Sequence, residues 1–178
     1  MENFNIELFA NDLESKVGLT LVGGRPGVGK TAFLLNVTSQ KLERNKNVFF
    51  VSLELDEESV KKYLLSTGLN NQNSLSKLAI YDKPNFNIDD LSDDETAVNS
   101  DLIVIDYLNL IGYANDKSLD YIVKQLKNIS NYNNINIIAT TQLSKSNDES
   151  RIPTESDFMI SEDVFSKYVD NSILLYEK

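Results

Sequence analysis

A glycine-rich stretch near the amino terminus carries the residue types that hold phosphate. It reads Gly24-Arg25-Pro26-Gly27-Val28-Gly29-Lys30-Thr31 and fits the P-loop pattern G-x-x-x-x-G-K-[ST]. Its glycines permit the backbone angles at which several N–H groups converge on one anion. Lys30 is expected to reach the β- and γ-phosphates of a nucleotide, and the Thr31 hydroxyl to bind Mg²⁺. The stretch therefore predicts a site for a nucleoside triphosphate and its magnesium ion.

The flanking residues predict the elements that must position this stretch. Residues 19–22 form a short apolar run that is typical of a buried strand. Residues 31–44 place Phe33, Leu34 and Val37 at the spacing of one helix face. The helix would point its unpaired N–H groups at the anion. A chance match or an ordinary glycine turn is the alternative. A dinucleotide-type loop is disfavoured because G-x-G-x-x-G is not spelled here.

Asp106 is the second candidate for chemistry. It follows the apolar run 102–105, which predicts a central parallel strand with a carboxylate at its carboxyl end. In P-loop NTPases this is the Walker B position, where the carboxylate helps to hold Mg²⁺. The alternative is an acidic residue that simply ends a strand. With a P-loop upstream, we expect Thr31 and Asp106 to share one metal ion.

Composition excludes several classes of site. The 178 residues include no cysteine and no histidine, so disulfides, zinc sites built on those residues and histidine-based triads are excluded. No apolar run is long enough for a membrane span, and the start does not resemble a signal peptide, so we expect a cytoplasmic protein. The net charge of −10 makes DNA contact doubtful, because phosphate contacts need Lys and Arg.

The remaining periodicity predicts one α/β domain over residues 1–178, with residues 1–18 as a lead-in. Strands are expected at 48–53, 78–81, 101–106, 135–141 and 172–176, and helices at 31–44, about 56–65 and 118–131. Residues 70–76 and 144–156 are expected to be polar loops, and the acidic span 82–100 a solvated loop with a short helix. Residues 158–168 show no clear period. The alternation predicts a mostly parallel sheet covered by helices on both faces.

Taken in order, four phrases resemble the RecA-like ATPase domain of the DnaB-type replicative helicases. They are LVGGRPGVGKT at 21–31, VSLEL at 51–55, IVIDYLNLI at 103–111 and TQLS at 141–144, and the likeness covers roughly residues 19–178. The resemblance implies a RecA-like P-loop NTPase fold, ATP and Mg²⁺ as ligands, and a role in DNA replication. It implies Glu54 as the carboxylate that polarises the attacking water, and Gln142 as the group that senses the γ-phosphate. For both residues the alternative is an exposed polar side chain that caps a strand.

The sequence also departs from this family. Members carry an amino-terminal primase-interacting domain and a linker helix, for which we expect no room in this chain. Members continue beyond the strand matching 173–176 into a hairpin with a basic finger. Here the sequence ends at Lys178, so such a finger is expected to be missing or to come from elsewhere, and Arg151 matches none. The family's DNA-gripping loop would fall at 157–165, which contains no Arg, Lys or Gly.

Three functions stay open from the sequence. The first is an ATPase in a helicase-like assembly, such as a ring of identical subunits. The second is a nucleotide-dependent binding module that regulates a helicase or another replication partner with little turnover, which the acidic charge favours. The third is a RecA-like recombination mediator, which the acidic charge disfavours.

Overall fold

The computed structural model describes residues 17–67, 69, 72–144 and 151–176, so most of the expected lead-in lies outside the described residues. These residues form one six-stranded sheet in the order β3-β2-β4-β5-β1-β6, and every neighbouring pair is parallel. The strands are β1 (Leu19–Gly24), β2 (Val48–Ser52), β3 (Leu78–Tyr81), β4 (Leu102–Asp106), β5 (Asn136–Gln142) and β6 (Asn171–Leu175). The expected parallel α/β sheet is confirmed.

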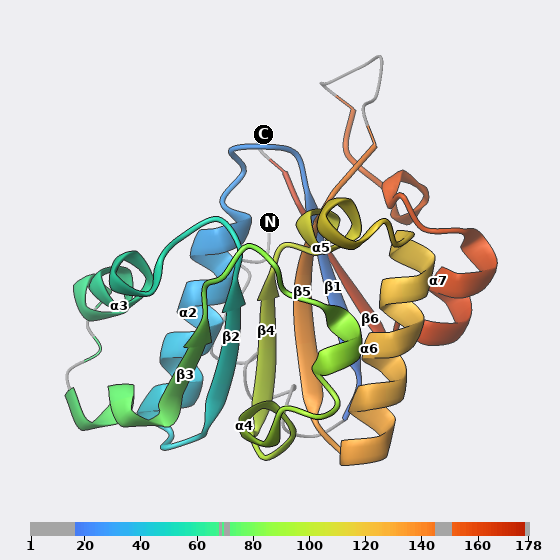
Figure 1. Ribbon diagram of the computed structural model, residues 1–178. Helices are drawn as coiled ribbons and strands as arrows, with labels where there is room; N and C mark the ends of the chain where they lie inside the picture. Colours follow the sequence, from blue (N-terminus) through green and yellow to red (C-terminus); the bar gives the residue numbers. More distant parts are fainter. Residues whose placement is uncertain (1–16, 68, 70–71, 145–150, 177–178) are drawn as a thin grey trace.

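Helices cover both faces of this sheet (Figure 1). The α-helices are α2 (Lys30–Glu43), α3 (Glu57–Ser66), α4 (Glu95–Val98), α5 (Leu108–Asn115), α6 (Leu119–Asn133) and α7 (Glu162–Tyr168). Three short 3₁₀ helices lie among the described residues, η1 (Gln72–Lys77), η2 (Ile88–Asp90) and η3 (Glu155–Asp157). In Figure 1 the strands run upward, and the loop between β1 and α2 lies over their carboxyl ends.

Alternation along the strands divides the apolar side chains between two cores. In β2, Phe49 and Val51 face one layer, while Val48 and Phe50 face the other. This is the period of two that an extended strand imposes. The first core packs against α5, α6 and α7, and the second packs against α2 and α3. Each fully buried side chain of this kind contributes roughly 1.5–3 kcal/mol of transfer free energy. The two cores therefore fix the strands whose ends carry the polar residues described below.

Three segments differ from the expectation. The polar loop expected at 70–76 includes η1, in which Ser74 and Leu75 are at least partly buried against the molecule. Residues 158–168, which show no clear period, form α7 over their second half. α7 buries only Val164 completely, so it is too short and too exposed to leave a periodic apolar stripe. α5 is a helix that periodicity alone did not indicate.

The acidic span 82–100 is not simply solvated. It buries four apolar side chains in the first core, namely Phe86, Ile88, Leu91 and Ala97. Its charges lie outward, and no group of three or more His, Cys, Asp or Glu that could hold a metal occurs within the part of the chain that the structure describes. The expectation of a solvated loop was therefore wrong for this span, because widely spaced apolar residues anchor a segment without helical or strand periodicity.

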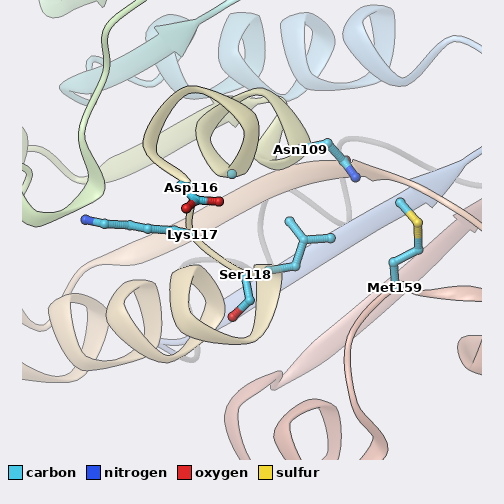
Figure 2. Close-up of a pocket in the computed structure, with 7 residues that line it drawn as sticks. Asn109, Asp116, Lys117, Ser118 and Met159 are labelled. Atoms are coloured by element: carbon cyan, nitrogen blue, oxygen red, sulfur yellow. The ribbon is translucent and has the colours of Figure 1, made fainter.

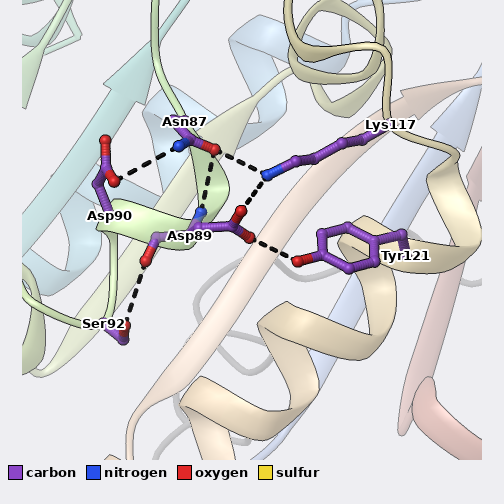
Figure 3. A network of polar contacts seen from close by, with 6 residues as sticks. All are labelled: Asn87, Asp89, Asp90, Ser92, Lys117 and Tyr121. Atoms are coloured by element: carbon purple, nitrogen blue, oxygen red, sulfur yellow. Dashed lines mark hydrogen bonds and ion pairs between the residues drawn. The ribbon is translucent and has the colours of Figure 1, made fainter.

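A polar network fastens this span to α6 (Figure 3). The Lys117 ammonium donates to Asp89 and, at 2.9 Å, to Asn87 Oδ1, and the Tyr121 hydroxyl donates to Asp89 Oδ1 at 2.8 Å. Lys117 Nζ also lies 5.1 Å from the centre of the Tyr121 ring. These contacts lower the pKa of the Asp89 carboxyl, chiefly through the hydrogen bond from Lys117. The network holds η2 against the start of α6.

No helix in the described ranges is long and apolar enough to cross a membrane.

Candidate active site

The loop between β1 and α2 has the shape that an anion-binding turn requires. Gly27 and Gly29 have φ values of 83° and 95°, in the left-handed region where glycine avoids the strain of a side chain. A Cβ atom on Gly24 would lie 2.6 Å from Val28 Cγ1, so the loop closes tightly over the strand end. Gly29 is also the residue from which α2 starts. The helix therefore directs its first unpaired N–H groups into the turn.

The Lys30 side chain curls back over this loop. Its ammonium donates to the carbonyl oxygens of Gly24 at 2.9 Å and Arg25 at 3.0 Å. Burial lowers the pKa of Lys30, while the negative charges of Asp106 and Glu54 oppose that effect. The ammonium group is thus held by carbonyl oxygens beside the turn, close enough to both carboxylates to feel their charge.

Asp106 lies behind the loop and receives two hydroxyl groups. Thr31 Oγ1 donates to its Oδ2 at 2.6 Å, and Thr140 Oγ1 donates to its Oδ1 at 2.5 Å. The three residues come from α2, β4 and β5, and Asp106 is only 2% exposed. Each carboxylate oxygen therefore has a fixed partner. The sequence indicated Thr31 and Asp106, whereas Thr140 was missed because nothing in its strand distinguishes it from a core threonine.

The turn after β2 carries Glu54. Ser52 Oγ donates to the Leu55 carbonyl oxygen at 2.6 Å, and the Leu53 N–H donates to the Asp106 carbonyl oxygen at 2.9 Å. Glu54 itself is exposed at the pocket. Its pKa is raised above the ordinary 4.5, first by lost solvation and then by the charge of Asp106, while Lys30 opposes the rise. A carboxylate with a raised pKa accepts a proton more readily than an ordinary glutamate.

Gln142 ends β5, and its backbone is bound by a residue that the sequence did not single out. Asn109 Oδ1 accepts from the Gln142 N–H at 2.9 Å and from Thr141 Oγ1 at 3.0 Å. Asn109 belongs to the first turn of α5 and is 5% exposed. The available signal was a polar residue inside the apolar run 108–111, immediately after the strand that ends in Asp106.

These side chains surround one pocket of about 420 Å³. It is lined by Pro26, Gly27, Gly29, Lys30, Thr31, Ala32, Leu35, Glu54, Leu55, Tyr63, Tyr107 and Gln142. Most of the predicted site residues thus share its wall. Gly24, Arg25 and Val28 belong to the loop without lining the pocket, and Asp106 reaches it through its contact with Thr31.

Arg151 lies near the loop but is already bound to its own chain. Its backbone carbonyl accepts from Arg25 Nη2 at 3.2 Å, and its own Nη2 donates to Asp157 Oδ1. The pKa of the Asp157 carboxyl is lowered, first by the backbone hydrogen bond from Thr154 and then by Arg151. Arg151 therefore joins the loop to the start of the segment 157–165 and does not extend toward the pocket wall described above.

The donor atoms beside the loop suit a magnesium ion. Mg²⁺ prefers oxygen ligands and is usually held by one or two carboxylates together with substrate phosphates and water. The Thr31 hydroxyl and the buried Asp106 carboxylate supply such oxygens at one place, 2.6 Å apart. The Thr140 hydroxyl orients the carboxylate in the manner of an outer partner of a metal ligand. The residues present therefore fit Mg²⁺.

Comparisons with known proteins agree with this geometry. Residues 13–73 and 67–176 match the family described as the DnaB-like helicase C terminal domain. The chain is 32% identical over 174 residues to a probable replicative DNA helicase of Trieres chinensis, covering 77% of this chain and 38% of that protein. The chain spans well under half the length of the curated relatives it matches first.

Solved structures show the same fold. An isolated ATPase domain of known structure superposes with a TM-score of 0.70 at 21% identity, over 90% of this chain and 70% of that one. A DnaB-like replicative helicase, whose structure was described with its interactions with primase, superposes with a TM-score of 0.69 at 21% identity, over 90% of this chain and 47% of that one. At this level of identity the likeness establishes a RecA-like fold.

Proposed function

The chain belongs to the DnaB-like helicase C-terminal domain family, and on that premise we propose that it binds Mg·ATP and hydrolyses it as a helicase-like ATPase in DNA replication. The observation that carries the proposal is the 2.6 Å contact between the Thr31 hydroxyl and the Asp106 carboxylate, beside the glycine loop and Lys30. An ordinary glycine turn has no reason to bring a buried carboxylate from β4 against the first turn of the next helix.

Each residue has one part in the proposed reaction. The loop 24–29 and the start of α2 bind phosphate oxygens through backbone N–H groups. Lys30 releases the carbonyl oxygens of Gly24 and Arg25 and reaches the β- and γ-phosphates. Thr31 and Asp106 hold Mg²⁺, which when bound neutralises charge that develops on the phosphates. These groups stabilise the transition state by electrostatic positioning rather than by covalent chemistry.

Glu54 and Gln142 complete the proposed site at the far end of the phosphates. Glu54 lines the same pocket as Lys30 and orients the attacking water, and its raised pKa suits a group that draws on the proton of that water. Gln142 lines the opposite strand end and contacts the γ-phosphate through its side-chain amide. Both assignments rest on their place in the pocket and on the family resemblance.

The test is steady-state ATP hydrolysis by the Lys30→Ala variant. Removing the ammonium should lower turnover by about a hundredfold or more, as expected for loss of a charge that acts on the transition state. Lys62→Ala, an exposed lysine on α3, is the matched control and should turn over at the wild-type rate. Unchanged turnover in Lys30→Ala would rule out this site. Parallel assays with GTP measure the base preference.

A second candidate is a nucleotide-dependent binding module with little turnover. It is favoured by the segment 157–165, which contains three acidic residues and no Arg, Lys or Gly. Such a module would bind Mg·ATP and dock onto a replication protein or onto further copies of itself. Equilibrium binding of Mg·ATP, combined with light scattering with and without nucleotide, separates the two candidates. Tight binding with negligible hydrolysis would favour the module, and robust hydrolysis would exclude it.

A further inference from the structure

We propose that Asn109 is a positioning residue that fixes the end of β5, and thereby the γ-phosphate contact of Gln142. The inference rests on the proposed function, since it concerns the same pocket. It is carried by two hydrogen bonds to Asn109 Oδ1, from the Gln142 N–H at 2.9 Å and from Thr141 Oγ1 at 3.0 Å.

The hydrogen-bond ladder of the sheet explains why β5 needs this residue. On one side, β1 follows β5 to its end, and Gly24 pairs with Gln142. On the other side, the pairing with β4 stops at Ile105 and Ala139, three residues earlier. The chain leaves β4 after Asp106 and enters α5. The Gln142 N–H would therefore lack a strand partner on this side, and the Asn109 side chain takes the place of the missing strand.

The same strand end is held again one residue further along. Leu143 forms an isolated antiparallel bridge with Phe158, and the Ser144 N–H donates to the Asp157 carbonyl oxygen at 2.8 Å. Residues beyond Gln142 thus depend on the segment after Arg151, whereas Gln142 itself depends on Asn109. Because one oxygen atom accepts both bonds, a small rotation of Asn109 changes the direction of the Gln142 peptide and of the side chain that leaves it.

Asn109 also lines a second pocket of about 600 Å³, on the side of α5 and α6 (Figure 2). This pocket is lined by Asn109, Gly112, Asp116, Lys117, Ser118, Leu119 and Met159. The side chain therefore stands between two hollows and is held by polar contacts more than by close apolar packing. A leucine at this position has similar size and room on the pocket side, so Asn109→Leu should fold while losing the acceptor oxygen.

The experiment is a double-mutant cycle on ATP turnover in the full chain. Asn109→Leu should lower kcat by about tenfold, the rate equivalent of losing a buried hydrogen-bond partner, and leave KM for ATP within about twofold. Gln142→Ala should lower kcat at least as far. In the Gln142→Ala background, Asn109→Leu should cause no further loss, because its effect acts through Gln142.

Thr141→Val is the matched control. It removes one of the two donors to Asn109 Oδ1 but keeps the bond to the Gln142 N–H, so kcat should stay within about twofold of wild type. Multiplicative effects of Asn109→Leu and Gln142→Ala would overturn the inference, as would a lower Tm of Asn109→Leu with unchanged kcat. Either result alongside an inactive Lys30→Ala variant would leave the proposed function standing, and an active Lys30→Ala variant would remove the proposed function itself.

Discussion

The two pockets at the carboxyl edge of the sheet differ in chemistry more than in size. The larger one, about 600 Å³, has Asp116 and Lys117 as its charged lining residues, and Lys117 is already paired with Asp89. The smaller one, about 420 Å³, gathers Lys30, Thr31, Glu54 and Gln142 from separate elements around a glycine loop. Its carboxylates and ammonium shift one another's pKa values, while no such coupling reaches the lining of the larger pocket from Lys30 or Glu54.

This comparison teaches that convergence of polar groups, rather than volume, marks the reactive site. The smaller pocket lies where β1, β2, β4 and β5 all end, so short turns bring their terminal residues together. The larger pocket lies beside α5 and α6, where the polar groups serve helix ends and the network with the span 82–100. The two regions share Asn109 as a boundary. The predictions below test whether activity belongs to the smaller pocket alone.

The largest effect is expected from Glu54→Gln. If Glu54 orients the water and accepts its proton, kcat should fall by about a hundredfold or more, the usual contribution of a positioned general base. Binding of Mg·ATP should persist, because Glu54 makes no contact with the loop's phosphate-binding groups. Glu58→Gln, on the exposed side of α3, is the control and should be fully active. Equal turnover of the two variants would remove Glu54 from the mechanism.

The pH profile of the wild-type protein sharpens this prediction. Because the pKa of Glu54 is raised above 4.5, its carboxyl keeps a proton to higher pH than an ordinary glutamate. Turnover should therefore decline as the pH falls through that raised value, and the acid limb of kcat/KM should lie above 4.5. The limb should vanish in Glu54→Gln. Its persistence in that variant would assign the titration to another group.

A smaller effect is expected from Thr140→Val, which removes the hydroxyl that donates to Asp106 Oδ1. Loss of such an outer partner weakens metal binding by about tenfold or somewhat more, so the Mg²⁺ concentration that gives half-maximal turnover should rise by that factor. Thr38→Val is a matched control, since the buried Thr38 hydroxyl has no hydrogen-bond partner among the described residues. An unchanged Mg²⁺ requirement in Thr140→Val would show that Asp106 needs no such support.

The smallest effect is expected from single-stranded DNA. Next to the larger pocket, the segment 157–165 offers acidic residues and no Arg or Lys, so it lacks the cations that phosphate contacts need. ATP turnover at low salt should change by less than about twofold when single-stranded DNA is added, because association with DNA depends on these charges. Strong stimulation that disappears with added salt would contradict this and would assign a DNA path to a part of the surface other than this segment.

The sequence by itself determined the glycine loop, its flanking strand and helix, and the carboxylate Asp106. These features are local: glycine positions, an apolar run and an acidic residue lie within a few residues of one another, and periodicity reports them directly. The parallel α/β fold followed from the alternation of such runs. The resemblance to a family then added Glu54 and Gln142, whose individual spacing carries no distinct signal.

Only the tertiary structure decided which polar residues hold that site in place. Asn109 meets Gln142 across 33 residues of sequence, and Thr140 meets Asp106 across 34. The tertiary structure also turned the acidic span 82–100 inward through Phe86 and its neighbours, and folded α7 where no period is visible. The physical reason is common to all of these: they depend on where the ends of separate strands meet, and strand order in a parallel sheet is set by packing between distant segments.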